Sequence, residues 1–265
     1  MRISGVYNLI LYIFCVSVLV VTAAAIIRPD KFLKTNYRGK KVILAGFWVN
    51  SAAVISGFLF LKQLEFRLIF AASMLISLIG LLDDLSGGSE KGFKGHFKAF
   101  LNGKITTGFL KLAGIGLLSL FVGYMLADSL SGALLNAVLL AGTSNLFNLL
   151  DLRPGRSIKF ALLPVFISFA FLNHEQLLFA LICFGFYLIY LPLDLREKAM
   201  LGDAGSNPLG FFVGAIFIFI AKITIVKILL VLAVVLLNLA SEKVSFTEVF
   251  EKNFLLNLYD RIGRK

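Results

Sequence analysis

Long apolar runs recur from one end of this sequence to the other and leave little room for a soluble fold. The run from Tyr7 to Ile27, YNLILYIFCVSVLVVTAAAII, carries no charge. It is long enough to cross a bilayer core of roughly 30 Å. A run at the start of a chain can also be an uncleaved signal-like segment, but here similar runs follow. We therefore predict that it is the first span of a polytopic membrane protein.

The expected fold is an all-α, polytopic membrane helical bundle. Residues 1–240 are expected to form the transmembrane domain and residues 241–265 a cytoplasmic tail. The chain is 59% hydrophobic, with a mean hydropathy of +0.91. Two segments, 159–173 and 208–221, are short for a full crossing and are expected to extend into their neighbouring loops or to tilt little. We predict about nine spans: 7–27, 42–61, 66–82, 105–127, 131–150, 159–173, 176–193, 208–221 and 223–240.

The charged residues fall into alternate loops, and this pattern predicts the orientation of the chain. A net charge of +11 would suggest a nucleic-acid partner in a soluble protein. Here most Lys and Arg residues lie in alternate loops, which the positive-inside rule places in the cytoplasm. We therefore expect a plasma-membrane protein with its N-terminus outside, its C-terminus inside and no nucleic-acid partner. The basic segments are 28–41, 83–104, 151–159, 194–207 and the tail from Ser241.

An acid pair ends the third predicted span in the sequence LIGLLDDLSGG. Asp83 and Asp84 repel each other and lose solvation near lipid, so a cation is expected beside them. One interpretation is a solvated helix end. The other is a site for Mg²⁺ and phosphate in which one acid serves as a base, with Gly87 and Gly88 permitting a close approach of the backbone to a ligand.

A polar stripe ends the fifth predicted span in the sequence GTSNLFNLLDLRPGRS. Asn145, Asn148 and Asp151 recur every three residues and share one drifting face of a helix. Such a stripe either binds a ligand or forms hydrogen bonds between helices. Arg153 and Arg156 follow directly; they suit bidentate phosphate binding, or they anchor the loop in the cytoplasm.

The third motif, MLGDAGSNPLG, places Asp203 among glycines on the same predicted face. Ser206 or Asn207 is expected to cap the next helix, with Pro208 in its first turn. The free N–H groups of a helix start attract anions, and a divalent cation would bridge such an anion to Asp203. Most basic residues of loop 28–41 are interpreted as topology signals or headgroup contacts, and Lys34 is the candidate for binding a substrate phosphate.

These motifs, in this order and on one face, resemble the polyprenyl-phosphate N-acetylhexosamine-1-phosphate transferase superfamily (glycosyltransferase family 4). MLGDAGSNPLG is similar to the F-x-G-D-x-G-S-x-x-L-G pattern of that superfamily and is the most specific signal. The resemblance implies that a UDP-sugar gives its sugar-1-phosphate to a polyprenyl phosphate, with release of UMP and a requirement for Mg²⁺. It also implies a role in cell-envelope glycan synthesis, and members of the superfamily can form homodimers.

The resemblance assigns roles to the residues of the three motifs. Asp83 is the candidate base or the acid that faces the lipid phosphate, and Asp84 supports it near the metal. Asp203 is the candidate Mg²⁺ ligand. Three residues are expected to line the nucleotide and metal pocket: Asn145, Asn148 and Asp151.

The chain also departs from the superfamily, and the departures leave a second function open. Its tail, SEKVSFTEVFEKNFLLNLYDRIGRK, has no histidine where the superfamily carries a histidine-rich motif. Pro154 stands where a second Asp is expected. The alternative is therefore a non-catalytic membrane homologue that binds a lipid phosphate or a cell-envelope partner. A transporter is a weaker third option, because the acids cluster at one face instead of mid-span.

Overall fold

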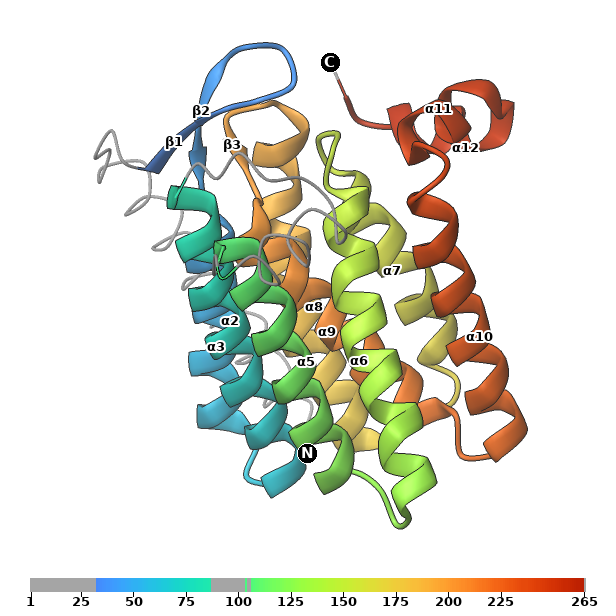
Figure 1. Ribbon diagram of the computed structural model, residues 1–265. Coiled ribbons are helices and arrows are strands. Elements are labelled where there is room, and N and C mark those ends of the chain that lie inside the picture. Colours follow the sequence, from blue (N-terminus) through green and yellow to red (C-terminus); the bar gives the residue numbers. More distant parts are fainter. Residues whose placement is uncertain (1–31, 87–102, 104–105, 265) are drawn as a thin grey trace.

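The structure is a bundle of roughly antiparallel helices with a small sheet at one end (Figure 1). This computed structural model describes residues 32–86, 103 and 106–264. The first predicted span, 7–27, and most of loop 83–104 lie outside the described residues. Each of the other eight predicted spans overlaps a helix: α2 (Gly46–Phe60), α3 (Leu64–Ser86), α5 (Thr107–Met125), α6 (Leu130–Leu150), α7 (Arg156–Ser168), α8 (His174–Leu195), α9 (Asp203–Ile220) and α10 (Thr224–Ser241).

Six of the described helices are long and apolar enough to cross a membrane: α3, α5, α6, α8, α9 and α10. Helices α2 and α7 are shorter, with 15 and 13 residues. Many large apolar side chains on the outside of the bundle are exposed, as expected for surfaces that face lipid. The all-α, multi-pass membrane fold is thus confirmed, while the count of nine spans and the orientation stay predictions.

Helix α9 lies at the centre of the bundle. It contacts α2, α3, α6, α7, α8 and α10, and nearly all of its side chains are buried. Phe212 of α9 packs against Phe70 of α3 and Phe179 of α8, with ring centroids 5.7 and 6.0 Å away. Closer to the motifs, a Cβ at Gly80 of α3 would stand 2.6 Å from the Asp203 carbonyl oxygen. The start of α9 thus lies directly against the last turns of α3, where two of the three motifs lie.

The start of α9 differs from the sequence prediction. The helix begins at Asp203, with Gly202 as its N-cap, so that Pro208 lies inside the helix. The predicted cap residues Ser206 and Asn207 instead donate hydrogen bonds back to the carbonyls of Gly202 and Asp203. Pro208 lacks an N–H to bond the Ala204 carbonyl, and the Ser77 hydroxyl of α3 donates to that oxygen instead, at 2.6 Å.

A three-stranded sheet replaces part of the predicted loops. Strands β1 (Leu33–Thr35) and β2 (Lys41–Leu44) form an antiparallel hairpin, and β2 pairs in parallel with β3 (Ala199–Met200). Val42 and Leu44 are buried on one face of β2. The sheet therefore ties the loop that carries Lys34 to the segment just before α9.

The tail folds back onto the same end of the bundle as the sheet (Figure 1). It forms two short helices, α11 (Phe246–Lys252) and α12 (Phe254–Arg261). Arg156, at the start of α7, forms a bidentate ion pair with Asp260 of α12, with contacts of 2.9 and 2.8 Å. Lys159 donates hydrogen bonds to three carbonyls at the end of α12. We call Arg156, Lys159, Thr247, Asp260 and Arg264 the tail cluster.

Candidate functional site

The acid pair at the end of α3 meets the acid at the start of α9. The carboxylate of Asp84 accepts a hydrogen bond from the Ala204 backbone N–H at 3.1 Å, one of the free N–H groups of a helix start. A Cβ at Gly202 would stand 2.7 Å from the Asp84 carboxylate, and Gly202 has φ +65°, so glycine is required at this contact. The backbone of MLGDAGSNPLG, at Gly202 and Ala204, is thus in direct contact with the carboxylate of Asp84.

Two lysines neutralise these acids. The Lys111 Nζ of α5 lies 2.6 Å from Asp203 Oδ2 and 3.0 Å from Asp83 Oδ2. The Lys34 Nζ of β1 lies 2.8 Å from Asp84 Oδ1. Carboxylates packed this closely require such cations. We call Asp83, Asp84, Asp203, Lys34 and Lys111 the carboxylate cluster.

The environment of Lys34 favours its charged form. Burial opposes the charge of its ammonium group, but the charge and hydrogen bond of Asp84 outweigh that effect together with the smaller contributions of Asp203 and Asp83. The net result is a pKa for Lys34 above its ordinary value. A lysine held charged in this way is suited to an anionic ligand. Its predicted role as a phosphate-binding residue is not tested by this geometry and stays a prediction.

Asp151 lies beside the carboxylate cluster but has a different environment. Its carboxylate accepts a hydrogen bond from the Gly202 N–H at 3.1 Å. Burial raises the pKa of Asp151 well above the ordinary range, and the negative charges of Asp194, Asp203 and Asp84 raise it further. Asp151 therefore holds a proton more readily than an exposed aspartate does.

The residues of the polar stripe of α6 contact two different helices, α9 and α10. Asn148 accepts a hydrogen bond from the Ser206 hydroxyl of α9, so it lies on the motif side. Asn145 points to α10 and donates to Asn238 Oδ1 at 2.7 Å. The interhelical hydrogen bond that the sequence left open is thus present at Asn145, where the drift of the stripe carries the side chain away from Asp151.

The two arginines that follow the stripe also separate. The Arg153 guanidinium lies 4.4 Å from the centroid of the Tyr37 ring. The Arg156 guanidinium is buried by the tail and is bonded to Asp260 and to the Thr247 hydroxyl. The substrate-binding role expected of both residues is not tested here, but only Arg153 borders the cavity described next.

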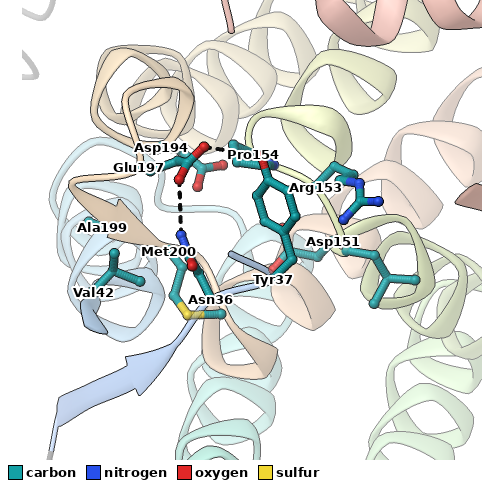
Figure 2. Close-up of a pocket in the computed structure, with 11 residues that line it drawn as sticks. Asn36, Tyr37, Val42, Asp151, Arg153, Pro154, Asp194, Glu197, Ala199 and Met200 are labelled. Carbon is teal, nitrogen blue, oxygen red and sulfur yellow. Dashed lines mark hydrogen bonds between the residues drawn. The ribbon is translucent and has the colours of Figure 1, made fainter. Parts of the chain in front are cut away.

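A small cavity of about 50 Å³ lies beside Asp151, between the β1–β2 turn and the start of β3. Figure 2 shows Asn36 and Tyr37 on one side and Glu197 on the other, and both side chains donate hydrogen bonds to the Glu197 carboxylate at 3.1 Å. Ligand pockets usually enclose several hundred Å³. The described side chains thus form a polar wall near Asp151 without enclosing a nucleotide.

The donor set suits a hard divalent cation. Among the described residues, no group of three or more His, Cys, Asp and Glu side chains is arranged to hold a metal by itself. Mg²⁺ needs only one or two carboxylates when substrate phosphates complete its shell. Asp83 and Asp203 already share one cationic group, the Lys111 ammonium. Oxygen ligands that converge on a positive charge fit Mg²⁺.

Two residues that shape the candidate site, Lys111 and Asp194, were not predicted from the sequence. Lys111 is a single lysine inside the apolar run TGFLKLAGIGLL, and a charge in that position marks a functional contact by default. Asp194 of α8 is buried and accepts a hydrogen bond from the Gly155 N–H at 2.8 Å, which holds the turn that carries Arg153. Both signals are present in the sequence, but their partners come from other helices.

A comparison with models of known protein families finds a match for the chain. The model of a family described as "Glycosyl transferase family 4" matches residues 66–221, more than half of the chain. The matched region contains Asp83, Asp84, Asp151 and Asp203. It ends before α10 and the tail. No curated protein matches the chain.

Proposed function

The chain belongs to glycosyltransferase family 4, and from that premise we propose that it transfers an N-acetylhexosamine-1-phosphate, or a related sugar-1-phosphate, from a UDP-sugar to a polyprenyl phosphate. At the general level the family already makes it a sugar-phosphate transferase that acts with a polyprenyl phosphate. The UDP-sugar donor, the Mg²⁺ requirement and a role in cell-envelope glycan synthesis are the proposed details. The proposed site faces the cytoplasm.

The carboxylate cluster is the observation that supports this proposal. Three acids from α3 and α9 meet at one end of the membrane bundle, although each charge near lipid is costly. Two of them share the Lys111 ammonium, and the third contacts Lys34. Phosphoryl transfer needs positioning and charge neutralisation more than a protein nucleophile, and this cluster offers both.

In the proposed reaction, an oxygen of the polyprenyl phosphate attacks the phosphorus next to the sugar. A new P–O bond forms, the bond to the bridging oxygen breaks, and UMP leaves with that oxygen. Asp83 lies at the end of α3 with its carboxylate partly exposed, and it is the group proposed to accept a proton from the lipid phosphate. Lys34 and Arg153 are proposed to bind phosphate oxygens. Asn148 is proposed to orient the nucleotide.

Mg²⁺ is proposed to be held by Asp203 and Asp84, and it would stabilise the negative charge on the transferred phosphate. The protein residues prepare that position, because the Ala204 N–H fixes one oxygen of Asp84. Lys111 keeps the neighbouring oxygens of Asp83 and Asp203 directed at one point. Replacing Lys111 with Met should leave these two carboxylates unbalanced and make the melting temperature depend more strongly on Mg²⁺.

UMP release tests the proposed function. Purified protein is incubated with Mg²⁺, a polyprenyl phosphate and a panel of UDP-N-acetyl sugars. UMP formed only in the presence of the lipid would support the transfer and identify the donor. Asp203→Asn should abolish it, whereas Asp128→Asn, the same change in the loop between α5 and α6, should not.

The alternative is a non-catalytic homologue that binds the lipid phosphate. It is favoured by the lysines, which neutralise the acids without any metal, and by the absence of a second acid at Pro154. Folded protein that binds polyprenyl phosphate but releases no UMP from any donor would support it. A homodimer stays an expectation from the family and can be checked by light scattering of the same sample.

A further inference from the structure

A second cavity, of about 340 Å³, lies where the tail meets the bundle. Its walls come from the β1–β2 turn, the segment before α7, and α11 and α12. We call it the arginine cavity, because five arginines line it against two carboxylates: Arg38, Arg153, Arg156, Arg261 and Arg264, with Glu251 and Asp260. It shares Arg153 and Tyr37 with the cavity beside Asp151, but no member of the carboxylate cluster lines it.

Asp260 neutralises the inner part of the arginine cavity. Its two oxygens bind Arg156 in a bidentate pair, and Arg264 contacts one of the same oxygens. Arg264 also donates to the Pro154 carbonyl at 2.8 Å. The side chains of Arg156 and Asp260 are almost fully buried, and that of Arg264 is partly buried. The inner arginines are thus occupied by the fold and shape the floor of the cavity.

Arg38 is paired with Glu197 at 3.2 Å, but two other outer arginines, Arg153 and Arg261, have donors to spare. Arg153 reaches Glu251 only at 3.5 Å, and its side chain is 27% exposed. The guanidinium of Arg261 has no hydrogen bond or ion pair with any described residue, and it is exposed beside the cavity. Guanidinium groups that converge without matching acids repel each other, and an anion with several oxygens relieves that repulsion through charge-assisted hydrogen bonds.

We propose that the arginine cavity is an anion site for a phosphate group, carried either by a soluble diphosphate or by a phosphorylated lipid headgroup. The ring of Tyr37 is covered by Arg153 at 4.4 Å, which leaves the guanidinium fork, not an aromatic face, as the binding surface. The cavity volume falls within the usual range for small ligands. The proposal does not rest on the carboxylate cluster. It shares Arg153 with the residues proposed to bind the substrate, so the test is made at Arg261, which has no role in the proposed transfer.

The test is a calorimetric titration of inorganic pyrophosphate into the detergent-solubilised protein. EDTA is included, so that no metal in the carboxylate cluster can bind the anion. Arg261→Ala should weaken binding about fivefold, as expected for one partly exposed charge-assisted contact. Glu251→Gln removes a competing carboxylate and should tighten binding. Lys252→Ala removes a charge from the same tail, but Lys252 does not line the cavity, so this variant should bind as the wild type does.

Two results would overturn the proposal. One is no pyrophosphate binding by the folded wild-type protein at millimolar concentration. The other is an equal loss in Arg261→Ala and Lys252→Ala, which would mean a diffuse positive surface and no defined site. Because neither readout involves UMP, a failure of the anion site and a failure of the transferase are distinguishable.

Lipid nanodiscs then assign the source of the phosphate group. The titration is repeated in phosphatidylcholine discs and in discs that contain phosphatidylglycerol. Weaker pyrophosphate binding only in the anionic discs, with the difference reduced in Arg261→Ala, would identify a lipid headgroup as the natural occupant. Equal binding in both discs would identify a soluble phosphate. Either result supports a phosphate site in the arginine cavity.

Discussion

The carboxylate cluster and the tail cluster lie at the same end of the bundle, yet they stabilise charge in different ways. In the carboxylate cluster, acids outnumber cations, and each contact to a lysine is a single Nζ–oxygen contact. In the tail cluster, a planar guanidinium grips one carboxylate with two bonds. An ammonium group is easily displaced, whereas a bidentate fork is rigid. We therefore expect the carboxylates of the carboxylate cluster to exchange a lysine for a ligand, and the Arg156–Asp260 pair of the tail cluster to stay intact.

The solvent exposure of the side chains also distinguishes the two clusters. The side chains of Asp83 and Asp203 are 19% and 20% exposed, but those of Arg156 and Asp260 are only 1% and 5% exposed. A ligand can therefore reach the first pair directly. The second pair lies at the floor of the arginine cavity, and its charges are already paired with each other. Charge burial alone thus does not identify a functional site; accessible, exchangeable partners do.

The largest effect is expected for Asp203→Asn. The variant should lower UMP release by about a thousandfold, because a fixed charge that acts on the transferred phosphate is lost. Its melting temperature without Mg²⁺ should change little, since Lys111 keeps Asp83 as a partner. A variant that retained more than a tenth of the wild-type rate would contradict the assignment of the carboxylate cluster as the catalytic site.

The opposite pattern is expected for Asp260→Asn. Breaking a buried ion pair leaves Arg156 uncompensated and should lower the free energy of unfolding by about 3 kcal/mol, while UMP release below the melting temperature stays within about threefold. Differential scanning fluorimetry of both variants makes the comparison. A large loss of activity with unchanged stability would place the tail cluster in the active site.

The same variant has a pH signature. Burial opposes ionisation of Asp260, but the hydrogen bonds and charges of Arg156 and Arg264 outweigh it, so the pKa of Asp260 lies below its ordinary value. The stabilisation is therefore complete above the ordinary Asp pKa near 4 and is lost as the pH falls through the lowered value. Melting curves from pH 7 down to pH 3 should converge for the wild type and Asp260→Asn.

A smaller effect on stability is expected for Asp151, and its dependence on pH should be opposite to that of Asp260. Its raised pKa means that stability is complete below the ordinary Asp pKa and is lost as the pH rises through the folded-state value. Asp151→Asn keeps an oxygen for the Gly202 N–H and avoids this loss. The variant should melt a few degrees above the wild type at pH 8, with a smaller difference at pH 5. No change in that difference with pH would contradict a raised pKa of Asp151.

The smallest effect is expected for Lys34→Gln. The Lys34 side chain is 43% exposed, so its ion pair with Asp84 should contribute less than about 1 kcal/mol to folding. The contribution is lost as the pH rises through the raised pKa of Lys34, in the alkaline range. Chemical denaturation at pH 8 measures it. A loss as large as that of Asp260→Asn would remove the contrast between the two clusters.

The sequence was sufficient for the helices and for the meeting of the main acids. The predicted span 131–150 corresponds to Leu130–Leu150, because a long apolar run in lipid must satisfy its own backbone. Asp83, Asp84 and Asp203 were expected on one face and do lie together. Family membership, predicted from the motifs, is confirmed by the match over residues 66–221.

The remaining features depend on contacts between distant segments. The residues of β3, Ala199 and Met200, carry no strand signal, since they pair only with β2. The start of α9 was predicted incorrectly because Ser77, from another helix, satisfies the carbonyl that Pro208 cannot. Arg156 and Arg153 look equivalent in the sequence, and only the folded tail distinguishes them.

The parallel pairing of β2 with β3 also means that the sheet can be completed only late in synthesis of the chain. Ile43 is synthesised well before Ala199, the residue with which it pairs. At ordinary translation rates the interval between them is on the order of ten seconds. During that interval the edge of β2 is an open template for another strand at the membrane surface. Lys41 begins β2 and Lys40 directly precedes it, so their charges repel a second nascent copy that approaches the strand. The site is thereby completed only when α9 is inserted, as a late step in the assembly of the bundle.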